Sequence, residues 1–507
     1  MGSLSHDMHA TFSLEEIYPV PAKGTFTYHQ PTITESLPKT NVNRNSSIKI
    51  LMKFHTLCIH ILFCITLSSS KSDISIGYQL ILAIPMVYIE GFIGKAFIME
   101  IDEKPPNFRA GVSIEAFNGR YSCSINVFLG SVKVWDSSHS SKLFTTDECI
   151  LELTKDGDLH LKGSDERVGW QTGTSGQGVE KLKLLETGNL VLVDAAERIM
   201  WQTFNFPTDV LLMGQRLSVA TRLTSYPSTA TFFYSLEIQH EKIVLYWNSG
   251  EPKYSYWEFK PSKGRNITFV ELTSRGLELF DDNFERFAQI TSTMSAPIRF
   301  LRLLNTTGNI GLYYYAPDNN SFEASFRALN ETCDLPLACN PYEICTRSDT
   351  CSCISSLPKE HNTTSDCIHG IKNSLCGKHQ AEMLELNSIT NVLTSSASTI
   401  TNITKQACAT LCLNNCTCSA ALYISSKGDP LETQQCTFYD IVQGAKQVET
   451  GSGFSYMVKM PKGTGGVYPR THLRKWVVNL VIVADIAIFA LVLGGVGYYM
   501  IWKRRKN

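Results

Sequence analysis

The sequence predicts a mainly β protein that carries one transmembrane helix near its C-terminal end. Short runs of alternating apolar and polar residues, such as KIVLYW and IGLYYY, dominate residues 72–329, and turn residues separate them. This pattern is typical of β-sandwiches and β-barrels. An internal repeat within the β region and a cluster of cysteines after it refine the prediction.

The repeat joins DGDLHLKGSDERVGWQT (156–172) to TGNLVLVDAAERIMWQT (187–203), which align without a gap at an offset of 31 residues. A fixed period of this size marks a repeated supersecondary unit. The sequence TGNIGL at 307–312 echoes TGNLVL at 187–192. We therefore expect the second half of the β region to repeat the first.

The bulk composition indicates several secreted domains. A chain of 507 residues is long enough for roughly three or four domains. The net charge of −1 gives no argument for nucleic-acid binding. Of the 16 cysteines, 12 lie between Cys333 and Cys436, which indicates disulfide modules in an oxidising compartment.

Residues 52–71 have the pattern of a secretory signal peptide: Lys53, an apolar core over 57–67, and small residues before Lys71. Residues 1–51 precede this signal, are polar and show no clear period. We interpret them as an extension of the gene model, with translation beginning at Met52. A genuine disordered N-terminal arm is the alternative.

Residues 476–502 are mostly apolar and long enough for one crossing of a bilayer core of about 30 Å. With the signal peptide, they predict a single-pass type I plasma-membrane protein with a juxtamembrane stalk (461–475) and a cytosolic tail (503–507). A second apolar run, 80–97, is interrupted by Pro85, Glu90, Gly91 and Lys95, so it predicts buried strands and no span.

Two polar residues, Asn479 and Asp485, lie within the predicted span. An aspartate near the bilayer centre costs about 2.5–3.5 kcal/mol on insertion scales, and such residues are candidate functional groups. Either the surrounding apolar residues offset that cost, or Asp485 pairs with a polar residue in a partner's span. The small residues from Ala490 to Gly497 favour close approach of another helix.

Several motifs together resemble the plant S-locus glycoproteins and their G-type lectin receptor relatives. The residues GNLVL (188–192), Trp201-Gln202 and FPTD (206–209) resemble the end of a bulb-type lectin domain. The resemblance implies a three-fold β-prism of four-stranded sheets, which accounts for the 31-residue period. It implies this order: bulb-type lectin domain (72–212), S-locus-like β domain (213–330), EGF-like module (331–368) and α+β PAN/apple domain (376–460).

The family's mannose motif, Q-x-D-x-N-x-V-x-Y, is degenerate in both matching strands. A site built on hydrogen bonds fails when its polar groups are missing. The first strand keeps one motif position and the second keeps two, so we expect both strands mainly to build the prism. An altered glycan site is the alternative, and its candidate residues are Asp156, Asp158, Asn189 and Val191. We expect Trp135, Trp170 and Trp201 to pack in the core instead of stacking on sugars.

The cysteines fall into two modules and one further pair. Cys123 and Cys149 lie outside the modules, and we expect them to bond. A zinc site is disfavoured by the absence of C-x₂-C spacing and paired histidines. The EGF-like resemblance implies Cys333–Cys345, Cys339–Cys351 and Cys353–Cys367. Residues 404–413 predict a helix with Cys408 and Cys412 four residues apart on one face. The PAN resemblance implies Cys408–Cys436 and Cys412–Cys418 and leaves Cys376–Cys416.

Seven sequons lie in the predicted ectodomain and predict N-glycosylation. They are Asn266, Asn305, Asn319, Asn330, Asn362, Asn402 and Asn415.

No motif for an enzyme is present: the chain has no G-x-S-x-G, H-E-x-x-H or P-loop sequence. The sequence therefore predicts a non-catalytic binding or co-receptor protein without a cofactor. Its expected partners are a receptor kinase or other membrane protein, or a glycan or glycoprotein ligand. The alternative function is an adhesive protein that holds cell-wall glycans.

Overall fold

The computed structural model describes residues 72–462, except 102–104, 140, 165–166, 226–231, 251–252, 262–263, 355–366, 368–380, 395–398 and 426–433, together with 494 and 505. The predicted N-terminal extension, signal peptide, membrane span with Asn479 and Asp485, and tail therefore lie outside the described residues, as do Asn362 and Cys376. No helix of the described part is long and apolar enough to cross a bilayer. The prediction of a mainly β protein is confirmed.

The first part of the chain folds into strands only, which we call the first prism. Its strands are β1 (Asp73–Ser75), β2 (Gln79–Ala83), β3 (Ile93–Glu100), β4 (Phe108–Phe117), β5 (Arg120–Leu129), β6 (Val132–Asp136), β7 (Leu143–Thr145), β8 (Glu148–Leu153), β9 (Leu159–Gly163), β10 (Val168–Gln171), β11 (Val179–Leu184), β12 (Leu190–Asp194) and β13 (Ile199–Gln202). They form three sheets, in the orders β1-β11-β12-β13, β10-β9-β8-β2 and β3-β4-β5-β6, and β7 pairs with β5.

One tryptophan from each sheet meets the other two inside the first prism. The ring centroids of Trp135 (β6), Trp170 (β10) and Trp201 (β13) lie 5.8–6.0 Å apart, each pair edge to face. This geometry is favourable for aromatic rings. Trp135 and Trp201 are buried. The tryptophans therefore form a core contact among the three sheets, as expected.

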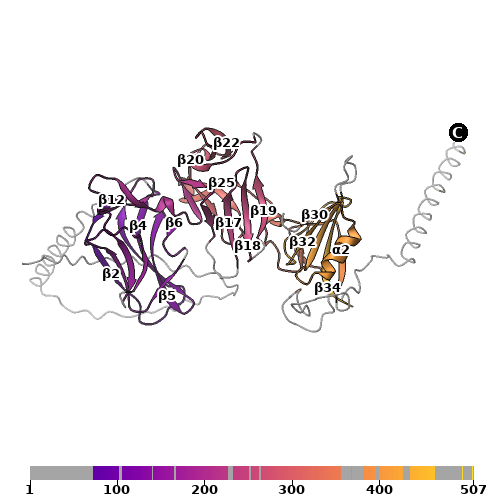
Figure 1. Ribbon diagram of the computed structural model, residues 1–507, viewed down its shortest axis with the longest axis horizontal. Helices are drawn as coiled ribbons and strands as arrows, with labels where there is room; N and C mark the ends of the chain where they lie inside the picture. Colours follow the sequence, from indigo (N-terminus) through magenta and orange to yellow (C-terminus); the bar gives the residue numbers. More distant parts are fainter. Residues whose placement is uncertain are drawn as a thin grey trace, which may run out of the picture. The chain divides into compact units, whose positions relative to one another are not determined.

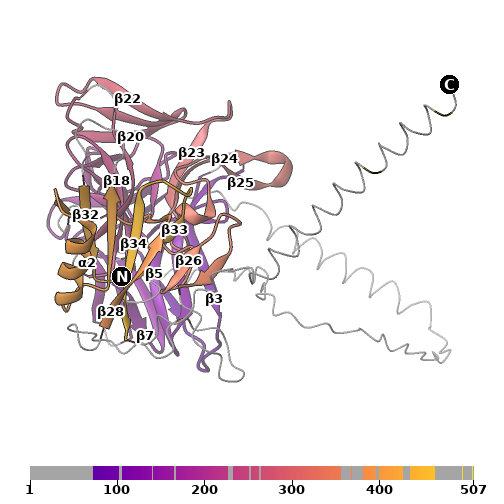
Figure 2. The same ribbon diagram turned by 90° about the vertical axis from the view of Figure 1, so that its right-hand side faces the viewer.

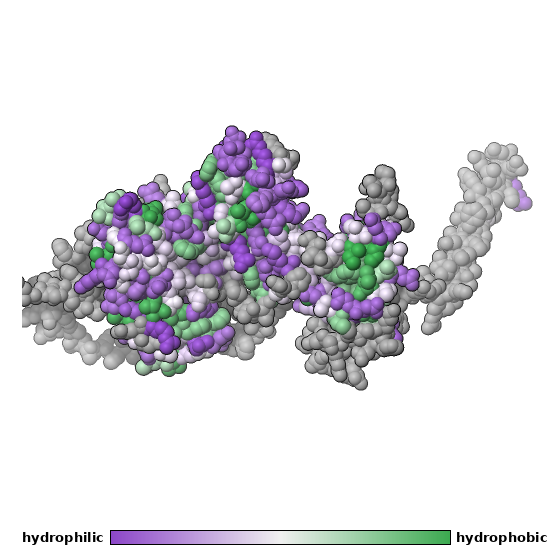
Figure 3. Space-filling view, viewed as in Figure 1, coloured by the Kyte–Doolittle hydropathy of each residue, from purple (hydrophilic) through white to green (hydrophobic). Residues whose placement is uncertain are grey.

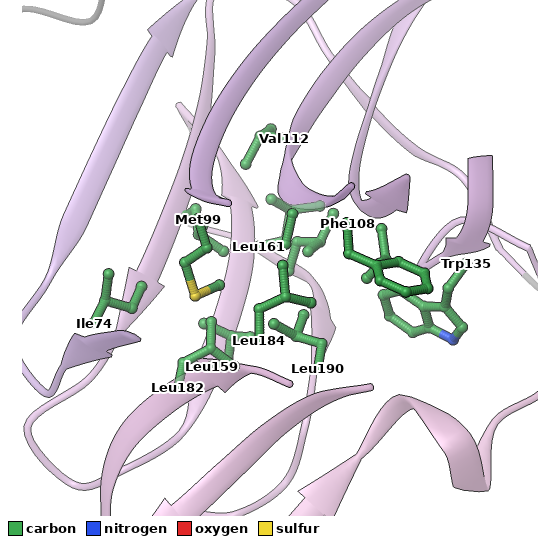
Figure 4. Close-up of a cluster of buried hydrophobic side chains, with 14 of the residues drawn as sticks. Ile74, Met99, Phe108, Val112, Trp135, Leu159, Leu161, Leu182, Leu184 and Leu190 are labelled. Carbon is green, nitrogen blue, oxygen red and sulfur yellow. The ribbon is translucent and has the colours of Figure 1, made fainter. Parts of the chain in front are cut away.

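Alternation along the strands fills the rest of this core. Leu159 and Leu161 of β9 point inward, as does Leu190 of β12 (Figure 4). Leu192 of β12 belongs to the same core. Successive side chains of a strand face opposite sides, so each sheet contributes one apolar face. The Cys123–Cys149 disulfide lies in this core and joins β5 to β8.

The next part of the chain builds a second prism, from three four-stranded sheets (Figure 1). Its strands are β14 (Val210–Leu212), β15 (Arg216–Ser218), β16 (Arg222–Thr224), β17 (Phe233–Ile238), β18 (Ile243–Asn248), β19 (Tyr254–Phe259), β20 (Phe269–Thr273), β21 (Gly276–Phe280), β22 (Arg286–Thr291), β23 (Ile298–Leu303), β24 (Ile310–Ala316) and β25 (Ser321–Arg327). The sheet orders are β14-β23-β24-β25, β15-β20-β21-β22 and β16-β17-β18-β19. The second half of the β region thus repeats the architecture of the first.

A shared turn shows that the repetition extends to local detail. The Asp194 carboxylate accepts from the N–H groups of Ala196 and Arg198, and the Asp281 carboxylate accepts in the same way from Asn283 and Glu285. Each turn has one residue with positive φ, Glu197 at 61° and Phe284 at 62°. Bulky residues rarely adopt this conformation, so the aspartate bonds hold a backbone shape that the side chains disfavour.

The two prisms make direct contact, and they belong to one compact unit. Strand β14 lies at the end of the stretch assigned to the lectin domain, yet it pairs with β23 of the second prism. Gln215 also donates to the Phe204 carbonyl, with a distance of 3.1 Å. The apolar core of the first prism includes Val210, Leu212 and Phe300 of the second.

Residues 250–256 and those from 329 onward form the second compact unit. Its elements are β26 (Glu343–Cys345), β27 (Cys351–Cys353), β28 (Ala381–Asn387), β29 (Ile389–Asn391), β30 (Thr399–Thr401), α2 (Lys405–Asn414), β31 (Ala420–Ser425), β32 (Gln434–Tyr439), β33 (Ala445–Gln447) and β34 (Phe454–Pro461). Helix α2 packs on the sheet β28-β34-β31-β32-β30. Thr404 caps its first turn by accepting from the Ala407 N–H at 3.3 Å.

A second sheet in this unit joins two segments that are far apart in sequence. Its order is β27-β26-β33-β29, and β26 runs parallel to β33 (Figure 2). Lys446 of β33 also forms ion pairs with Glu331 at 2.8 Å and Asp334 at 2.5 Å. The cystine hairpin, which we define as β26 and β27, is therefore bonded to the body that contains α2.

The run 80–97 folds into strands, as predicted, but much of it is exposed. Strands β2 and β3 are each at the edge of a sheet. Ile81 and Ile93 are 52% and 61% exposed, and Met86 between the strands is fully exposed. The expectation of burial therefore holds for Leu82 and Ile84 and is wrong for Ile81 and Ile93, because successive side chains of a strand face opposite sides and only one side packs on the core. In the second unit, an apolar patch also lies on the surface over α2 (Figure 3).

We predict that Trp201→Ala destabilises the folded chain by about 3–5 kcal/mol, because it removes a large buried ring from the contact among the three sheets. Urea unfolding followed by tryptophan fluorescence and circular dichroism measures the change. Met86→Ala is the control, and we expect it to change little because Met86 is fully exposed. Equal effects of the two substitutions would contradict a core role for Trp201.

Candidate functional site

In each sheet of the first prism, the residue two positions after the tryptophan has a hydroxyl side chain. This hydroxyl is hydrogen-bonded to an inner strand of the same sheet. In each case the hydroxyl oxygen accepts a hydrogen bond from a strand N–H. The pairs are Leu159 N to Thr172 Oγ1 at 3.1 Å, Leu190 N to Thr203 Oγ1 at 3.0 Å, and Ile125 N to Ser137 Oγ at 2.9 Å. We call this contact the hydroxyl bracket.

The bracket engages Asn189, one of the predicted sugar-binding residues. The Asn189 Oδ1 accepts from the Thr203 hydroxyl at 3.0 Å and from the Phe204 N–H at 3.2 Å. Its Nδ2 donates to the Gln202 side chain at 2.8 Å. The residue is 4% exposed. Asn189 therefore links β12 to the chain after β13 and offers little of its amide to a ligand.

Asp158 has the equivalent position in the preceding repeat. Its Oδ1 accepts from the Thr172 hydroxyl at 2.7 Å and from the Thr174 N–H at 3.1 Å. Its Oδ2 lies 3.1 Å from the His160 Nε2. Burial raises the pKa of Asp158, but the hydrogen bonds from Thr172, Thr174 and His160 outweigh burial and lower the pKa below its ordinary value. The buried carboxylate is thus stabilised as an anion inside the repeat.

The other two candidates do not complete a site with them. Val191 is fully buried. Asp156 is exposed in the turn before β9, and its carbonyl accepts from the Gly176 N–H at 2.8 Å. The structure therefore brings Asp158 and Asn189 into equivalent internal positions and leaves Asp156 as the exposed member of the set.

The third sheet carries polar residues that the motif comparison missed. On β5, Ser122, Ser124 and Asn126 alternate with Cys123 and Ile125. The cysteine and the isoleucine belong to the apolar core, so the three polar side chains face the opposite side of the sheet. The alternation is visible in RYSCSINVFL (120–129), but this strand lacks the Gly-Asp-Leu (157–159) or Gly-Asn-Leu (188–190) signature of the other two.

The cysteines form the following described disulfides: Cys123–Cys149, Cys333–Cys345, Cys339–Cys351, Cys353–Cys367, Cys408–Cys436 and Cys412–Cys418. Cys416 is also disulfide-bonded, and its predicted partner Cys376 lies outside the described residues. Glu343 lies close to two of these disulfides. A bonded cysteine has no thiolate to offer, so we assign no metal site there.

Six of the seven predicted glycosylation sites fall on described residues, and all six asparagines are exposed. They are Asn266, Asn305, Asn319, Asn330, Asn402 and Asn415. An enzyme can reach a side chain only at the surface, so their positions are compatible with modification.

We predict that Thr172→Val destabilises the chain in a pH-dependent way. The folded-state pKa of Asp158 is lowered, so its contribution to stability is present above the unfolded pKa of about 4 and is lost as the pH falls through the folded pKa. The variant loses a donor to this carboxylate. The stability difference from the wild type should therefore be largest near pH 7 and shrink below pH about 4.

Thr203→Val is the matched control, because it breaks the same bracket where the partner is the uncharged Asn189. Its stability loss should show little dependence on pH. Urea unfolding of both variants across pH 3–7 measures the two profiles. Parallel profiles would contradict a charge-dependent role for the Thr172 hydroxyl.

Comparisons with known proteins agree with this domain content. A family model described as D-mannose binding lectin matches residues 133–229, and a model described as PAN domain matches residues 386–459. The G-type lectin S-receptor-like serine/threonine-protein kinase SD2-5 of Arabidopsis thaliana is 26% identical over 66% of this chain. The alignment covers 41% of that kinase, so the chain spans well under half of its length.

Two relatives of other kinds also match. The PAN domain-containing protein At5g03700 of Arabidopsis thaliana is 24% identical over 73% of this chain and 73% of its own length. EP1-like glycoprotein 4 of the same plant is 31% identical over 44% of this chain and 56% of its own length. The chain thus carries a D-mannose binding lectin domain and a PAN domain, and it is a homologue of the plant G-type lectin S-receptor kinases, a PAN domain-containing protein and the EP1-like glycoproteins.

Proposed function

We propose that this chain is a cell-surface recognition protein of the S-domain lectin type, which acts by binding and without catalysis. Its combination of lectin and PAN domains supports this function, and its relatives include an EP1-like glycoprotein and a PAN domain-containing protein besides kinases. The observation that carries the proposal is that one chain combines a match to a lectin domain with a match to a PAN domain. The polar groups of the two predicted mannose strands are engaged inside the prism.

This engagement argues against mannose as the ligand of β9 and β12. Asp158 and Asn189 have the positions at which the motif presents a polar group to a sugar. Asp158 has both carboxylate oxygens in hydrogen bonds, and Asn189 has both ends of its amide in hydrogen bonds. A sugar at either place would have to break those bonds, and the groups left without partners would then destabilise the complex.

For the membrane end, we propose that residues 476–502 anchor the protein and that a partner passes the signal inward. Their length and apolar composition support the anchor. Asp485 would then pair with a polar residue in the span of a receptor kinase. The relatives that are receptor kinases make such a partner a reasonable one to test.

The second candidate is an adhesive protein that holds cell-wall glycans, and the lectin domain favours it. A glycan array and chemical cross-linking at the cell surface, both with the full chain, separate the two functions. Binding to wall glycans without a cross-linked membrane protein supports adhesion. A cross-linked receptor kinase that is lost in Asp485→Leu supports the co-receptor.

We predict that the full chain is not retained on a mannose column at ordinary salt. Asn189→Ala should leave this result unchanged and should lower the stability by about 1–3 kcal/mol, because it leaves the Thr203 hydroxyl and the Phe204 N–H without their acceptor. Chromatography and urea unfolding provide the two measurements. Mannose-dependent retention that is lost in Asn189→Ala would disprove the proposed structural role.

We also predict that peptide-N-glycosidase treatment converts a diffuse band of the membrane-extracted protein into a sharper, faster one, because six described sequons are exposed. Replacing each asparagine by glutamine in turn maps the modified sites on gel shifts. An unchanged band would contradict an extracellular location for these domains.

A further inference from the structure

Helix α2 is held to its unit by cysteines and exposes a large apolar side chain. Its buried residues are Cys408 and Cys412, which bond to Cys436 and Cys418. Leu411 is next to Cys412 in the chain and is 45% exposed, on the helix over which the apolar patch of this unit lies (Figure 3). An exposed apolar patch is a candidate contact surface, so the question is what covers it.

Leu411 belongs to an exposed stripe that ends at a glycosylation sequon. Ala407, Leu411 and Asn415 follow one another at intervals of four residues, and all three are exposed. Residues four apart lie one above the other on a helix. Asn415 keeps this position although it caps the helix, because its N–H still donates to the Leu411 carbonyl at 3.1 Å. With Thr417 it forms the sequon Asn-Cys-Thr, so the modifiable asparagine lies directly beyond the exposed leucine.

Hydrogen bonds fix Asn415 and leave one of its atoms for modification. Its Oδ1 accepts from the Thr417 N–H at 3.1 Å and from the Thr417 hydroxyl at 2.9 Å. Its carbonyl accepts from the Cys418 N–H at 3.1 Å and from the Lys459 ammonium at 2.6 Å. Within the described part of the chain, its Nδ2 has no partner. This nitrogen is the atom that carries an N-linked glycan, and because Oδ1 is held toward Thr417, Nδ2 points away from Thr417.

Two other sequons provide contrasts. The Asn319 Nδ2 donates to the Glu323 carboxylate at 2.7 Å, so that amide nitrogen is already engaged. Asn330 is exposed and belongs to the same unit as α2. Among the described residues from 295 to 399, however, no large apolar side chain is exposed beside it. Asn415 thus combines a fixed, unpartnered amide nitrogen with a neighbouring exposed apolar side chain.

We propose that Asn415 carries an N-linked glycan that folds back along α2 and covers Leu411. The first sugar of such a glycan is N-acetylglucosamine, whose C–H groups and acetyl methyl bury the leucine side chain while its hydroxyls remain in water. The glycan then shields this face of the PAN domain, and a protein partner binds the domain elsewhere. The inference rests on the extracellular location in the proposed function and assigns the α2 surface to a covalent ligand.

The test uses the full chain purified from plant cells. Glycopeptide mass spectrometry measures the modification of Asn415, and hydroxyl-radical footprinting measures the exposure of Leu411. Asn415→Asp is the matched variant, because aspartate keeps the Oδ1 acceptor for Thr417 and lacks the nitrogen that carries the glycan. We expect Leu411 to be oxidised about threefold more in Asn415→Asp than in the wild type, because the glycan removes most of its surface from water. Ile93, which is 61% exposed in the first prism, is the internal reference.

Further variants separate the glycan contact from effects on folding. Peptide-N-glycosidase acting on the folded wild type produces the same aspartate, so the comparison does not depend on how Asn415→Asp folds. Asn330→Asp removes a sequon elsewhere in the unit and should leave the oxidation of Leu411 at the wild-type level. Thr417→Ser keeps the sequon and the hydroxyl, so it should keep the protection. Leu411→Ser should lower the melting temperature of the glycosylated protein by about 2 °C and change it little in the Asn415→Asp background.

Three results would overturn the inference. The first is an unmodified Asn415 in a chain whose other sequons carry glycans. The second is equal oxidation of Leu411 in the purified wild type and in Asn415→Asp. The third is protection of Leu411 in both forms at the cell surface, which would assign the patch to a protein partner. The proposed function fails differently, because its extracellular location is contradicted only when none of the exposed sequons is modified.

Discussion

A hydroxyl that accepts a strand N–H connects each sheet of the first prism to the tryptophan of that sheet. The bracket positions the middle strand, and in two sheets it also engages the polar residue next to that strand, Asp158 or Asn189. Those are the residues on which a mannose site of the family's type would depend. The same hydrogen bonds that stabilise the prism therefore engage the polar side chains at these two positions.

The repeat made much of this architecture predictable. A 31-residue offset places Trp170 and Trp201 in equivalent positions, and equivalent positions around a three-fold axis meet at its centre. The sequence predicts a helix over 404–413, and the helix is observed at Lys405–Asn414. The one-residue difference arises because Thr404 is the capping residue that precedes the first turn. Local patterns and internal symmetry were therefore sufficient for the core.

Other features depend on contacts that a linear pattern does not contain. The lowered pKa of Asp158 depends on a hydrogen bond from Thr172. Thr172 lies 14 residues later and becomes a neighbour only because β9 pairs with β10. The exposure of Ile81 follows from its place on the outer face of β2, which an apolar run does not reveal because both of its faces are apolar. The polar face of β5 was missed because this strand lacks the signature of the two repeats, and its place between β4 and β6 is a property of the sheet.

The parallel pairing of β26 with β33 also has a mechanical consequence. Backbone bonds join the cystine hairpin to β33, which lies between β32 and β34 in the chain, and the Lys446 ion pairs lie next to them. Tension applied along these two strands would load the hydrogen bonds of their two paired positions side by side, in shear, so that these bonds share the force. The hairpin and the body with α2 thus form one element under force, and a recombinant exchange of either module alone would leave a sheet edge without its partner.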